Sequence, residues 1–490
     1  MFLASNKNVF ADFCTNDDCV HNLTILPPRS LRGHSLQSSP DCQSWASLMK
    51  SVMAARYCKQ LFIVCIIILV TFLLYAWRAD LTIAQVSLFV KTNSTSPPRM
   101  VLGHGNTLVE FFSDWTTADP HDPVPVQRVY VYFATLALQH TPPTGSHIRI
   151  TAFQEQRVAQ LRCCFRHHGN DTSAPALVVH TLKVENKQEV LGVVYQCHVP
   201  ISPQNLTGIR VTMTPDSACP VEDVYYLPVY IPEVVKGGLA ICGKVAFGGL
   251  LDPVKLVEWF EMQKLLGVDK IQILDFDNSV NVKKVFQYYQ ETGLLAMFPL
   301  KLPGRPWGRG FTDKTRVLYQ LAQDEDFSIL ECRLRLAGYD YVMGIDMDEI
   351  ILPRNTMSLK PYFQKIFGPN PRLAAVYFHV QFFVEEFGPE DKDAPLHVLR
   401  YLKSTPARWE CQKYTYMPAR ADQGSTHSIS PFPGFTTTRA SPREAVIHHY
   451  RHCPQGWSQC TPPHITERSV TRFQDELVPR VKEVLSKLGF

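Results

Sequence analysis

Between Leu239 and Ile345 the chain alternates four apolar runs with three helical patterns, and this alternation restricts the fold more than any other feature. Four runs have the composition of buried strands, namely Leu239–Ala246, Lys270–Leu274, Leu294–Phe298 and Tyr341–Ile345. Asp252 and Pro253 supply an N-cap and a proline at the first helical position. This strand–helix order predicts a mainly parallel sheet flanked by helices, with the carboxyl ends of its strands at one edge.

Three carboxylates, Asp346, Asp348 and Glu349, directly follow the fourth run. Carboxylates gathered at a strand end repel one another unless a cation lies among them. Since side chains two apart on an extended backbone point to the same face, we expect Asp346 and Asp348 to approach one divalent ion together. Glu349 would point into the sheet and orient the loop. The alternative is a solvated acidic turn.

A second polar strand end lies at Asp275, Asp277 and Asn278. In a parallel sheet it shares an edge with Asp346, and nucleotides bind at that edge of α/β sheets. Asp275 or Asp277 could therefore accept hydrogen bonds from uracil or ribose. Either could instead cap the following helix.

The segment Leu61–Trp77 is apolar and contains no charged residue. Its length is near the lower limit of the roughly 17 to 25 residues that span a membrane. Lys50, Arg56 and Lys59 precede it, which predicts a cytoplasmic N-terminus and a C-terminal part across the membrane. A buried core helix and a cleavable signal peptide are the alternatives.

The 490 residues exceed one compact core, so we expect several folded parts. Short β-type runs without convincing helices predict a small β-sandwich-like domain at residues 99–232, which either packs against the next domain or binds carbohydrate. The full predicted order is a largely disordered tail at 1–60, a transmembrane anchor at 61–77, a stem at 78–98, the β-rich domain at 99–232, the α/β domain at 233–463 and a C-terminal helix at 464–490. Pro479 should kink or split that helix.

Charge and cysteines restrict the partners and the compartment. A net charge of +4 on so long a chain argues against a nucleic-acid-binding protein. Glycosylation sequons at Asn93, Asn170 and Asn205 follow the membrane run, and one at Asn22 precedes it. An odd number of the 14 cysteines also follows the run, so disulfides are expected there, with at least one thiol left free or paired to another chain.

Several separated blocks resemble one known family. The blocks are Glu258–Glu261 continuing through Leu265–Asp269 to Asp277–Ser279, Cys332–Arg335 leading to Ile345–Ile350, Lys413-Tyr414 with Pro418 before His427-Ser428, and His448–Arg451. In this order, the region from about Leu239 to Arg451 resembles glycosyltransferase family 92, whose members have a GT-A fold. The chain departs from the family pattern at Met262, Gln263, Phe276, Tyr341 and Ile350, none of which is a metal-binding carboxylate.

The resemblance implies an inverting transferase that moves a hexose, typically galactose from UDP-galactose, to a glycan hydroxyl. Mn²⁺ or Mg²⁺ held by Asp346 and Asp348 would neutralise the diphosphate leaving group. The membrane anchor, β-rich domain and GT-A domain together look like a type II Golgi enzyme with a lumenal catalytic domain.

In GT-A enzymes a histidine from the C-terminal side often completes the metal site. Here His449 and His448 are the candidates, followed by His427, and each could instead be a structural histidine. Arg451 or Lys413 could contact the pyrophosphate, although a solvated basic residue is the alternative.

Inversion requires a general base that takes the proton of the acceptor hydroxyl. Glu385 and Glu386, which follow the β-type run Ala374–Val380, are the first candidates, against a solvated acidic loop. A catalytically inactive Golgi glycan-binding or scaffold protein stays open as an alternative, as does a transferase that uses another UDP-sugar. Manganese-dependent hydrolysis of UDP-galactose would distinguish an enzyme from a lectin.

Overall fold

The computed structural model describes residues 109–111, 129–138, 146–154, 160–182, 191–199, 208–215, 218–221, 226–247, 251–276, 278–300, 318–453 and 464–490. They fall within one compact unit of the chain. The predicted tail, membrane run and stem at residues 1–98 lie outside them, as do Asp277 and Asn205. None of the described helices combines the length and the apolar character needed to cross a membrane.

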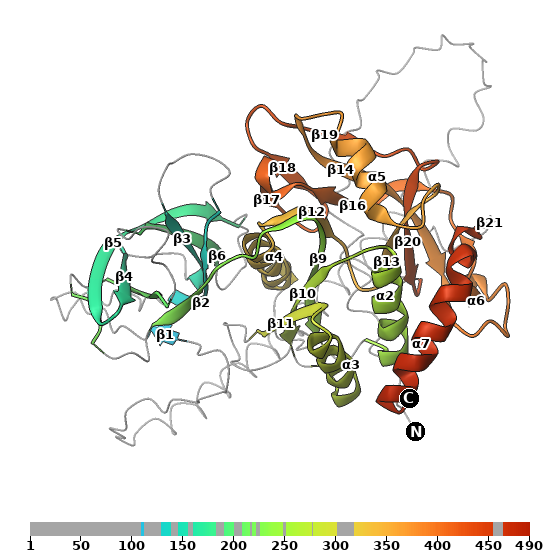
Figure 1. Cartoon of the computed structure of the whole chain (residues 1–490), viewed down its shortest axis with the longest axis horizontal. Helices are drawn as coiled ribbons and strands as arrows, with labels where there is room; N and C mark the ends of the chain where they lie inside the picture. The colour runs from blue at the N-terminus through green and yellow to red at the C-terminus, as the bar shows by residue number, and fades with distance from the viewer. Residues whose placement is uncertain are drawn as a thin grey trace, which may run out of the picture. The chain divides into compact units, whose positions relative to one another are not determined.

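Eight strands form the β-rich part (Figure 1). They are β1 (Val109–Phe111), β2 (Val129–Leu136), β3 (His147–Gln154), β4 (Arg162–His167), β5 (Asn170–Thr181), β6 (Leu191–His198), β7 (Arg210–Thr214) and β8 (Leu227–Tyr230). β5 pairs with β4 through its first half and with β6 through its second half, and β8 pairs with both β7 and β2. The sheet therefore closes on itself, whereas the sequence predicts two sandwich layers.

The interior of the β-rich part is apolar. Ile148, Phe165 and Val193 are fully buried in one cluster. Two disulfides, Cys163–Cys197 and Cys164–Cys219, tie β4 to β6 and to the segment before β8. Burial of this kind is the main source of stability in so small a unit.

The second sheet begins with the predicted strand–helix alternation. Its elements are β9 (Val235–Phe247), α2 (Pro253–Leu265), β10 (Lys270–Phe276), α3 (Val280–Glu291), β11 (Leu295–Pro299), α4 (Leu318–Arg335) and β12 (Tyr339–Gly344). The four strands are parallel and lie in the order β11-β10-β9-β12, which confirms the parallel arrangement predicted for this region. Asp252 caps α2, accepting from the N–H groups of Val254 and Lys255.

The other half of this sheet is mixed, so the predicted parallel arrangement is found in only some of its strand pairs. After β13 (Glu349–Pro353) and α5 (Leu359–Phe367), its strands are β14 (Leu373–Val384), β16 (Arg408–Tyr416), β19 (Thr436–Arg439) and β20 (Ala445–Arg451). β16 runs antiparallel to both β12 and β14, and β13 runs antiparallel to β20. These antiparallel pairs join strands that are far apart in the sequence, whereas helical crossovers between successive strands produce the parallel half.

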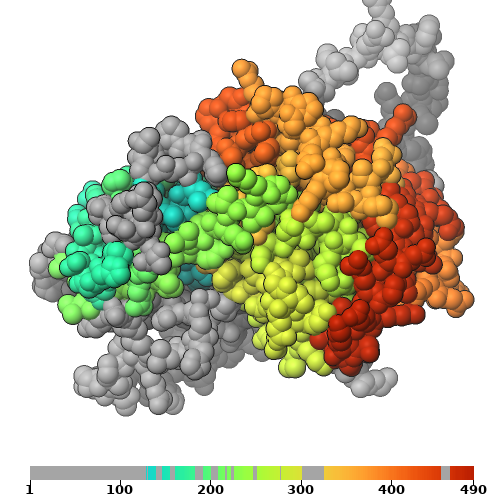
Figure 2. Space-filling model, viewed as in Figure 1, coloured from blue at the N-terminus to red at the C-terminus, as the bar shows by residue number. Residues whose placement is uncertain are grey.

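Small elements connect and flank these strands. They are η5 (Glu385–Phe387), α6 (His397–Arg400), β15 (Lys403–Ser404), η6 (Pro418–Arg420), β17 (Ala421–Gly424), β18 (Ile429–Pro431), β21 (Ile465–Thr466), η8 (Ser469–Phe473) and α7 (Gln474–Leu488). Helix α7 packs against α2, and the end of α7 reaches α3 where Lys284 donates to the Leu488 carbonyl. Figure 2 shows this C-terminal helix, in red, along the yellow-green surface. Pro479 lies inside α7, so it does not split the helix.

Helix α4 of the α/β part packs between its own sheet and the β-rich part. Phe327 of α4 stacks on Phe153 of β3, with ring centroids 4.2 Å apart. On the α/β side, the disulfide Cys242–Cys332 ties α4 to β9. The predicted packing of the β-rich part against the α/β part is therefore present in this structure.

Candidate active site

The Asp346–Glu349 segment forms a tight turn between β12 and β13. The Glu349 N–H donates to the Asp346 carbonyl at 3.1 Å, and the Asp346 N–H donates to the Glu349 carboxylate at 2.9 Å. The expected extended backbone, with Asp346 and Asp348 on one face, is therefore wrong. The turn separates the two aspartates, because each one meets a different basic partner.

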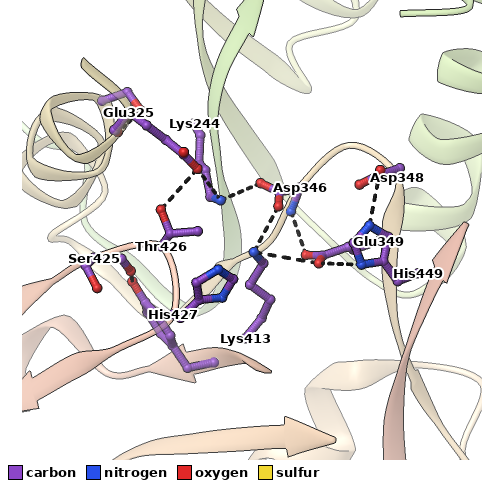
Figure 3. Close-up of polar contacts among 12 residues, drawn as sticks. Lys244, Glu325, Asp346, Asp348, Glu349, Lys413, Ser425, Thr426, His427 and His449 are labelled. Atoms are coloured by element: carbon purple, nitrogen blue, oxygen red, sulfur yellow. Dashed lines mark hydrogen bonds and ion pairs between the residues drawn. The ribbon is translucent and has the colours of Figure 1, made fainter. Parts of the chain in front are cut away.

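Asp346 lies between two lysines from the neighbouring strands (Figure 3). Its carboxylate is 2.6 Å from Lys244 Nζ and 2.9 Å from Lys413 Nζ. The sheet register explains this, because Gly344 of β12 pairs with Cys242 of β9 on one side and with Tyr414 of β16 on the other. The side chain two residues after Gly344 is therefore flanked by both strands.

A β-bulge in β9 directs Lys244 to this position. Gln272 pairs with Cys242 and Leu274 pairs with Val245, so two residues of β9 lie opposite one residue of β10. Lys244 in this bulge has a φ of 57°, which is rare for a residue with a side chain. Bulges change the direction of side chains and are frequent beside functional sites.

Both lysines are buried and charged. The side chains of Lys244 and Lys413 are 5% and 2% exposed. Burial alone would lower the pKa values of both lysines. Asp346 raises both pKa values, with a further contribution from Glu325 for Lys244 and from Glu349 for Lys413. Conversely, burial would raise the pKa of Asp346, and the two lysines hold it below its ordinary value. Asp346 is therefore ionised.

Glu325 of α4 is the second partner of Lys244. Its carboxylate is 2.7 Å from Lys244 Nζ and accepts a hydrogen bond from the Thr426 hydroxyl at 3.0 Å. His427 follows Thr426 in the chain. The His427 Nδ1 atom is 3.1 Å from the Gln412 carbonyl, so this histidine is held by the backbone of β16.

Glu349 is fully buried beneath the turn. Its carboxylate is 3.7 Å from Lys413 and 3.3 Å from His449 Nδ1, and its backbone carbonyl accepts from the Trp259 indole at 2.8 Å. Burial raises the pKa of Glu349 to about 7, although Lys413 opposes the shift. This placement agrees with the predicted inward orientation of Glu349.

His449 and Asp348 form the outer part of this cluster. The His449 Nε2 atom is 3.3 Å from Asp348, whose side chain is 51% exposed. Burial would lower the pKa of His449, but Asp348 and Glu349 raise it. His449 in turn holds the pKa of Asp348 below its ordinary value. Arg451, two residues along β20, acts electrostatically on both groups.

The cluster offers few ligands for a divalent cation. Within the described residues, no group of three or more His, Cys, Asp or Glu side chains could hold a metal ion. Asp348 and His449 do supply one oxygen and one nitrogen donor at the accessible side of the cluster, a donor pair that Mn²⁺ accepts. Among the described residues, Asp348 and His449 are therefore the candidate pair of cation ligands.

The structure separates His448 from the other predicted ligands. Adjacent residues of a strand point to opposite faces, so His448 points away from His449. The His448 ring lies 4.4 Å from the Phe383 ring, and its Nε2 atom is 3.5 Å from the Ser469 hydroxyl. Burial lowers the pKa of His448 to about 3, which keeps the ring neutral. Its predicted place among the metal ligands is therefore wrong.

Asp275 and Asn278 stabilise a strand end. The Asn278 amide donates to Asp275 at 2.6 Å and to the Ala246 carbonyl of β9 at 2.7 Å. The N-cap of α3 is Ser279, so the capping alternative does not hold for Asp275. Asp275 lies at the same sheet edge as the Asp346 turn, because β10 and β12 both run parallel to β9.

Glu385 and Glu386 follow β14, whose end lies beside the end of β20. The Glu385 carboxylate is 2.5 Å from Lys255 Nζ and 3.0 Å from His397 Nε2. The hydrogen bond with His397, and after it the contact with Lys255, lowers the pKa of Glu385 to about 2. Glu386 accepts the Cys453 N–H at 2.9 Å, and its side chain is 48% exposed. The sequence alone does not indicate these contacts of Glu385 and Glu386.

Sequence reasoning missed Lys244, Glu325 and Trp259. Lys244 carried a usable signal, because a lysine inside an otherwise apolar strand needs a buried partner. Trp259 lies within the Glu258–Glu261 block of the family resemblance, which does not indicate its role, and Glu325 has no distinguishing pattern. Their roles depend on contacts between residues far apart in the sequence.

We call the seven residues Lys244, Glu325, Asp346, Asp348, Glu349, Lys413 and His449 the Asp346 cluster. A sequence model described as "Glycosyltransferase family 92" matches residues 238–485, which is just over half of the chain and includes every member of this cluster. The chain belongs to glycosyltransferase family 92. It is therefore a glycosyltransferase, and the resemblance seen in the sequence is confirmed.

The chain is also similar to a protein named beta-1,4-galactosyltransferase galt-1 from Caenorhabditis elegans. The two are 26% identical over 143 residues, which are 29% of this chain and 31% of the relative. The chain thus matches about a third of the length of that relative.

Among solved structures, the chain aligns with glucosyl-3-phosphoglycerate synthase from Mycobacterium tuberculosis, in complex with Mn²⁺ and UDP. The identity is 12%, with 52% of this chain and 80% of that one covered, and the TM-score is 0.22. For TarS from S. aureus the identity is 10%, the coverage is 50% and 64%, and the TM-score is 0.21. Scores this low carry no structural inference.

Proposed function

We propose that this family 92 member transfers galactose from UDP-galactose to a glycan hydroxyl, with inversion at the sugar carbon. The observation that carries the proposal is the Asp346 cluster, which places ionised carboxylates and a histidine at the carboxyl edge of a sheet within the family region. The name of the similar galactosyltransferase supports galactose as the sugar. We further propose that the α/β part is of the GT-A type.

Asp348 and His449 would hold a divalent cation, Mn²⁺ or Mg²⁺. When bound, the cation supplies positive charge to the departing diphosphate. Asp346 is already neutralised by Lys244 and Lys413, so we propose that it orients the turn and contacts the donor ribose. Lys413 is buried on Asp346 and Glu349, and we therefore propose a positioning role for it in place of direct pyrophosphate contact. Arg451 stays our candidate for that contact.

The acceptor proton requires a base near the end of β14. Glu385 is occupied by Lys255 and His397, and a carboxylate with a pKa of about 2 is a weak base. Glu386 is more exposed, and we propose it as the base. Glu386→Gln should lower kcat for transfer. Glu385→Gln should act mainly on stability, because it weakens the Lys255 and His397 contacts.

We also propose that the segment at residues 61–77 anchors the chain as a type II Golgi membrane protein with its catalytic part in the lumen. The support is the apolar segment and its flanking positive charges. An epitope at each end, tested for protease protection in sealed Golgi vesicles, would determine the orientation. Protection of the N-terminal epitope alone would contradict the proposal.

The decisive experiment is a donor screen on the full chain in detergent. UDP-galactose and other UDP-sugars are offered with a glycan acceptor, with and without manganese. We expect UDP-galactose to give the highest rate, with loss of activity after chelation and in Asp348→Asn. Asp393→Asn, which changes an exposed aspartate outside the cluster, is the matched control. Absence of donor turnover under every condition would favour the glycan-binding or scaffold alternative.

A further inference from the structure

One sequence motif in the β-rich part has no place in the proposed transfer reaction. Asn170, Asp171 and Thr172 form an Asn-x-Thr sequon at the start of strand β5. Asn93 and Asn205 carry the other sequons after the membrane run and lie outside the described residues, whereas Asn170 has a defined place in the fold. A motif this short occurs often by chance, so its surroundings decide whether it can carry a glycan.

The sequon lies at the tip of a tight β-hairpin. His167, the last residue of β4, pairs with Asn170. Only His168 and Gly169 lie between them, with φ values of 49° and 77°. Positive φ at both positions is what a two-residue type I′ hairpin turn requires. A methyl group added to Gly169 would meet no atom within 4 Å beyond its chain neighbours, so the tip projects into open space.

The middle residue of the sequon braces this tip. Asp171 accepts two hydrogen bonds from the Arg166 guanidinium, at 2.8 and 2.7 Å, and the guanidinium lies 4.1 Å from the centre of the Tyr226 ring. Adjacent side chains of a strand point to opposite faces, so Asn170 and Thr172 share the face opposite Asp171. The hairpin is therefore held in place without the asparagine amide or the threonine hydroxyl.

Both of those side chains are accessible. Asn170 and Thr172 are exposed, and neither side chain forms a hydrogen bond to another residue in the part of the chain that the structure describes. An N-linked glycan is bulky and solvated, so the folded protein must leave room for it at the modified asparagine. At this tip a glycan would displace no packed group.

We propose that Asn170 carries an N-linked glycan. The amide nitrogen forms a bond to the anomeric carbon of an oligosaccharide held on a lipid diphosphate. The bond from that carbon to the diphosphate oxygen breaks, the lipid diphosphate leaves with the electron pair, and the amide loses one proton. The proposal rests on the proposed lumenal orientation, because N-linked glycans are added on that side of the membrane. The disulfide Cys164–Cys219, which joins β4 to the segment before β8, supports an oxidising compartment independently.

The test is expression of the full chain in eukaryotic cells, followed by peptide mass spectrometry. Peptide N-glycosidase in isotopically labelled water converts a glycan-bearing asparagine into labelled aspartate, which we expect at position 170. Asn170→Gln and Thr172→Val should each lose one glycan and show the same increase in gel mobility. Thr172→Ser should retain the glycan, because it keeps the hydroxyl. Asp171→Ala, which breaks the Arg166 ion pair but keeps the motif, should retain it as well.

The remaining sequons distinguish a failure of this proposal from a failure of the proposed orientation. A glycan at Asn93 or Asn205 with none at Asn170 overturns the present proposal and leaves the lumenal orientation standing. Unmodified asparagine at all three positions, or a glycan at Asn22, overturns both. Wild-type gel mobility of Asn170→Gln would likewise show that Asn170 is not modified.

Discussion

Lys244 of β9 forms an ion pair of 2.6 Å with Asp346, which lies in the turn that follows the neighbouring strand β12. Lys244→Met should leave the carboxylates of Asp346 and Glu325 with less positive charge to offset their mutual repulsion. Removing one partner of a buried pair costs about 3–5 kcal/mol, and we expect urea denaturation to show a loss of this size. Lys365→Met, which alters an exposed pair with Glu444, should cost less than about 1 kcal/mol. Equal losses in the two variants would contradict a special role for Lys244.

The adjacent residues His448 and His449 provide a matched pair, because they occupy opposite faces of β20. His449→Gln should raise the manganese concentration for half-maximal transfer by about 10- to 100-fold, since it removes a proposed donor. His448→Gln should leave that concentration unchanged and should reduce stability, because His448 packs on Phe383. Activity titrations with manganese, together with urea denaturation, measure both effects. A similar shift in manganese dependence for both variants would argue against the assignment of His449.

Glu258 should make the stability of the protein depend on pH. It is buried on α2, where burial raises its pKa from 4.5 to about 7, although the N–H groups of His397 and Val398 donate to it. Between these two values the folded protein holds a proton that the unfolded chain has released. The free energy of unfolding therefore falls as the pH rises through this range.

In Glu258→Gln this contribution is absent, so the stability should vary less between pH 5 and pH 8, by up to about 3 kcal/mol. Urea denaturation at several pH values measures the difference. Glu476→Gln, at an exposed position beside Arg480, should keep the wild-type profile. A Glu258→Gln profile parallel to the wild type would show that the folded-state pKa is not raised.

A buried polar contact joins the β-rich part to helix α4. Thr151 donates to Glu331 at 2.6 Å, and Glu331 also pairs with Arg335, whose guanidinium lies 3.9 Å from the Phe298 ring centre and 4.5 Å from that of Tyr230. Thr151→Val should cost about 1–3 kcal/mol and Arg335→Met about 3–5 kcal/mol. A double-mutant cycle read by calorimetry should show coupling between the two and one unfolding transition. Two separate transitions in the wild type would contradict this close coupling.

Local sequence patterns were sufficient for the parallel half of the α/β sheet and for the position of its acidic turn. Strand composition, the Asp252 cap and the strand–helix order depend on neighbouring residues, so they are visible in one sequence. The antiparallel strand pairs of the mixed half were not predicted, because short runs such as Arg408–Tyr416 do not reveal their partners.

The acidic residues of the candidate site were predicted, but the way in which basic residues neutralise them was not. The sequence indicates Asp346, Asp348 and Glu349, and it places Lys413 and His449 near them only through the family resemblance. Lys244 enters through a bulge, and a bulge changes side-chain direction without a clear sequence signal. The turn likewise follows from hydrogen bonds between Asp346 and Glu349 that spacing alone does not indicate.

The Cys242–Cys332 disulfide joins the strand that carries Lys244 to the helix that carries Glu325. Such a bond forms readily only where thiols are oxidised. Protein produced in a reducing bacterial cytosol would therefore lack this brace, while protein secreted from eukaryotic cells would retain it. The choice of expression host thus becomes part of any activity measurement, and an inactive bacterial preparation would not by itself count against catalysis.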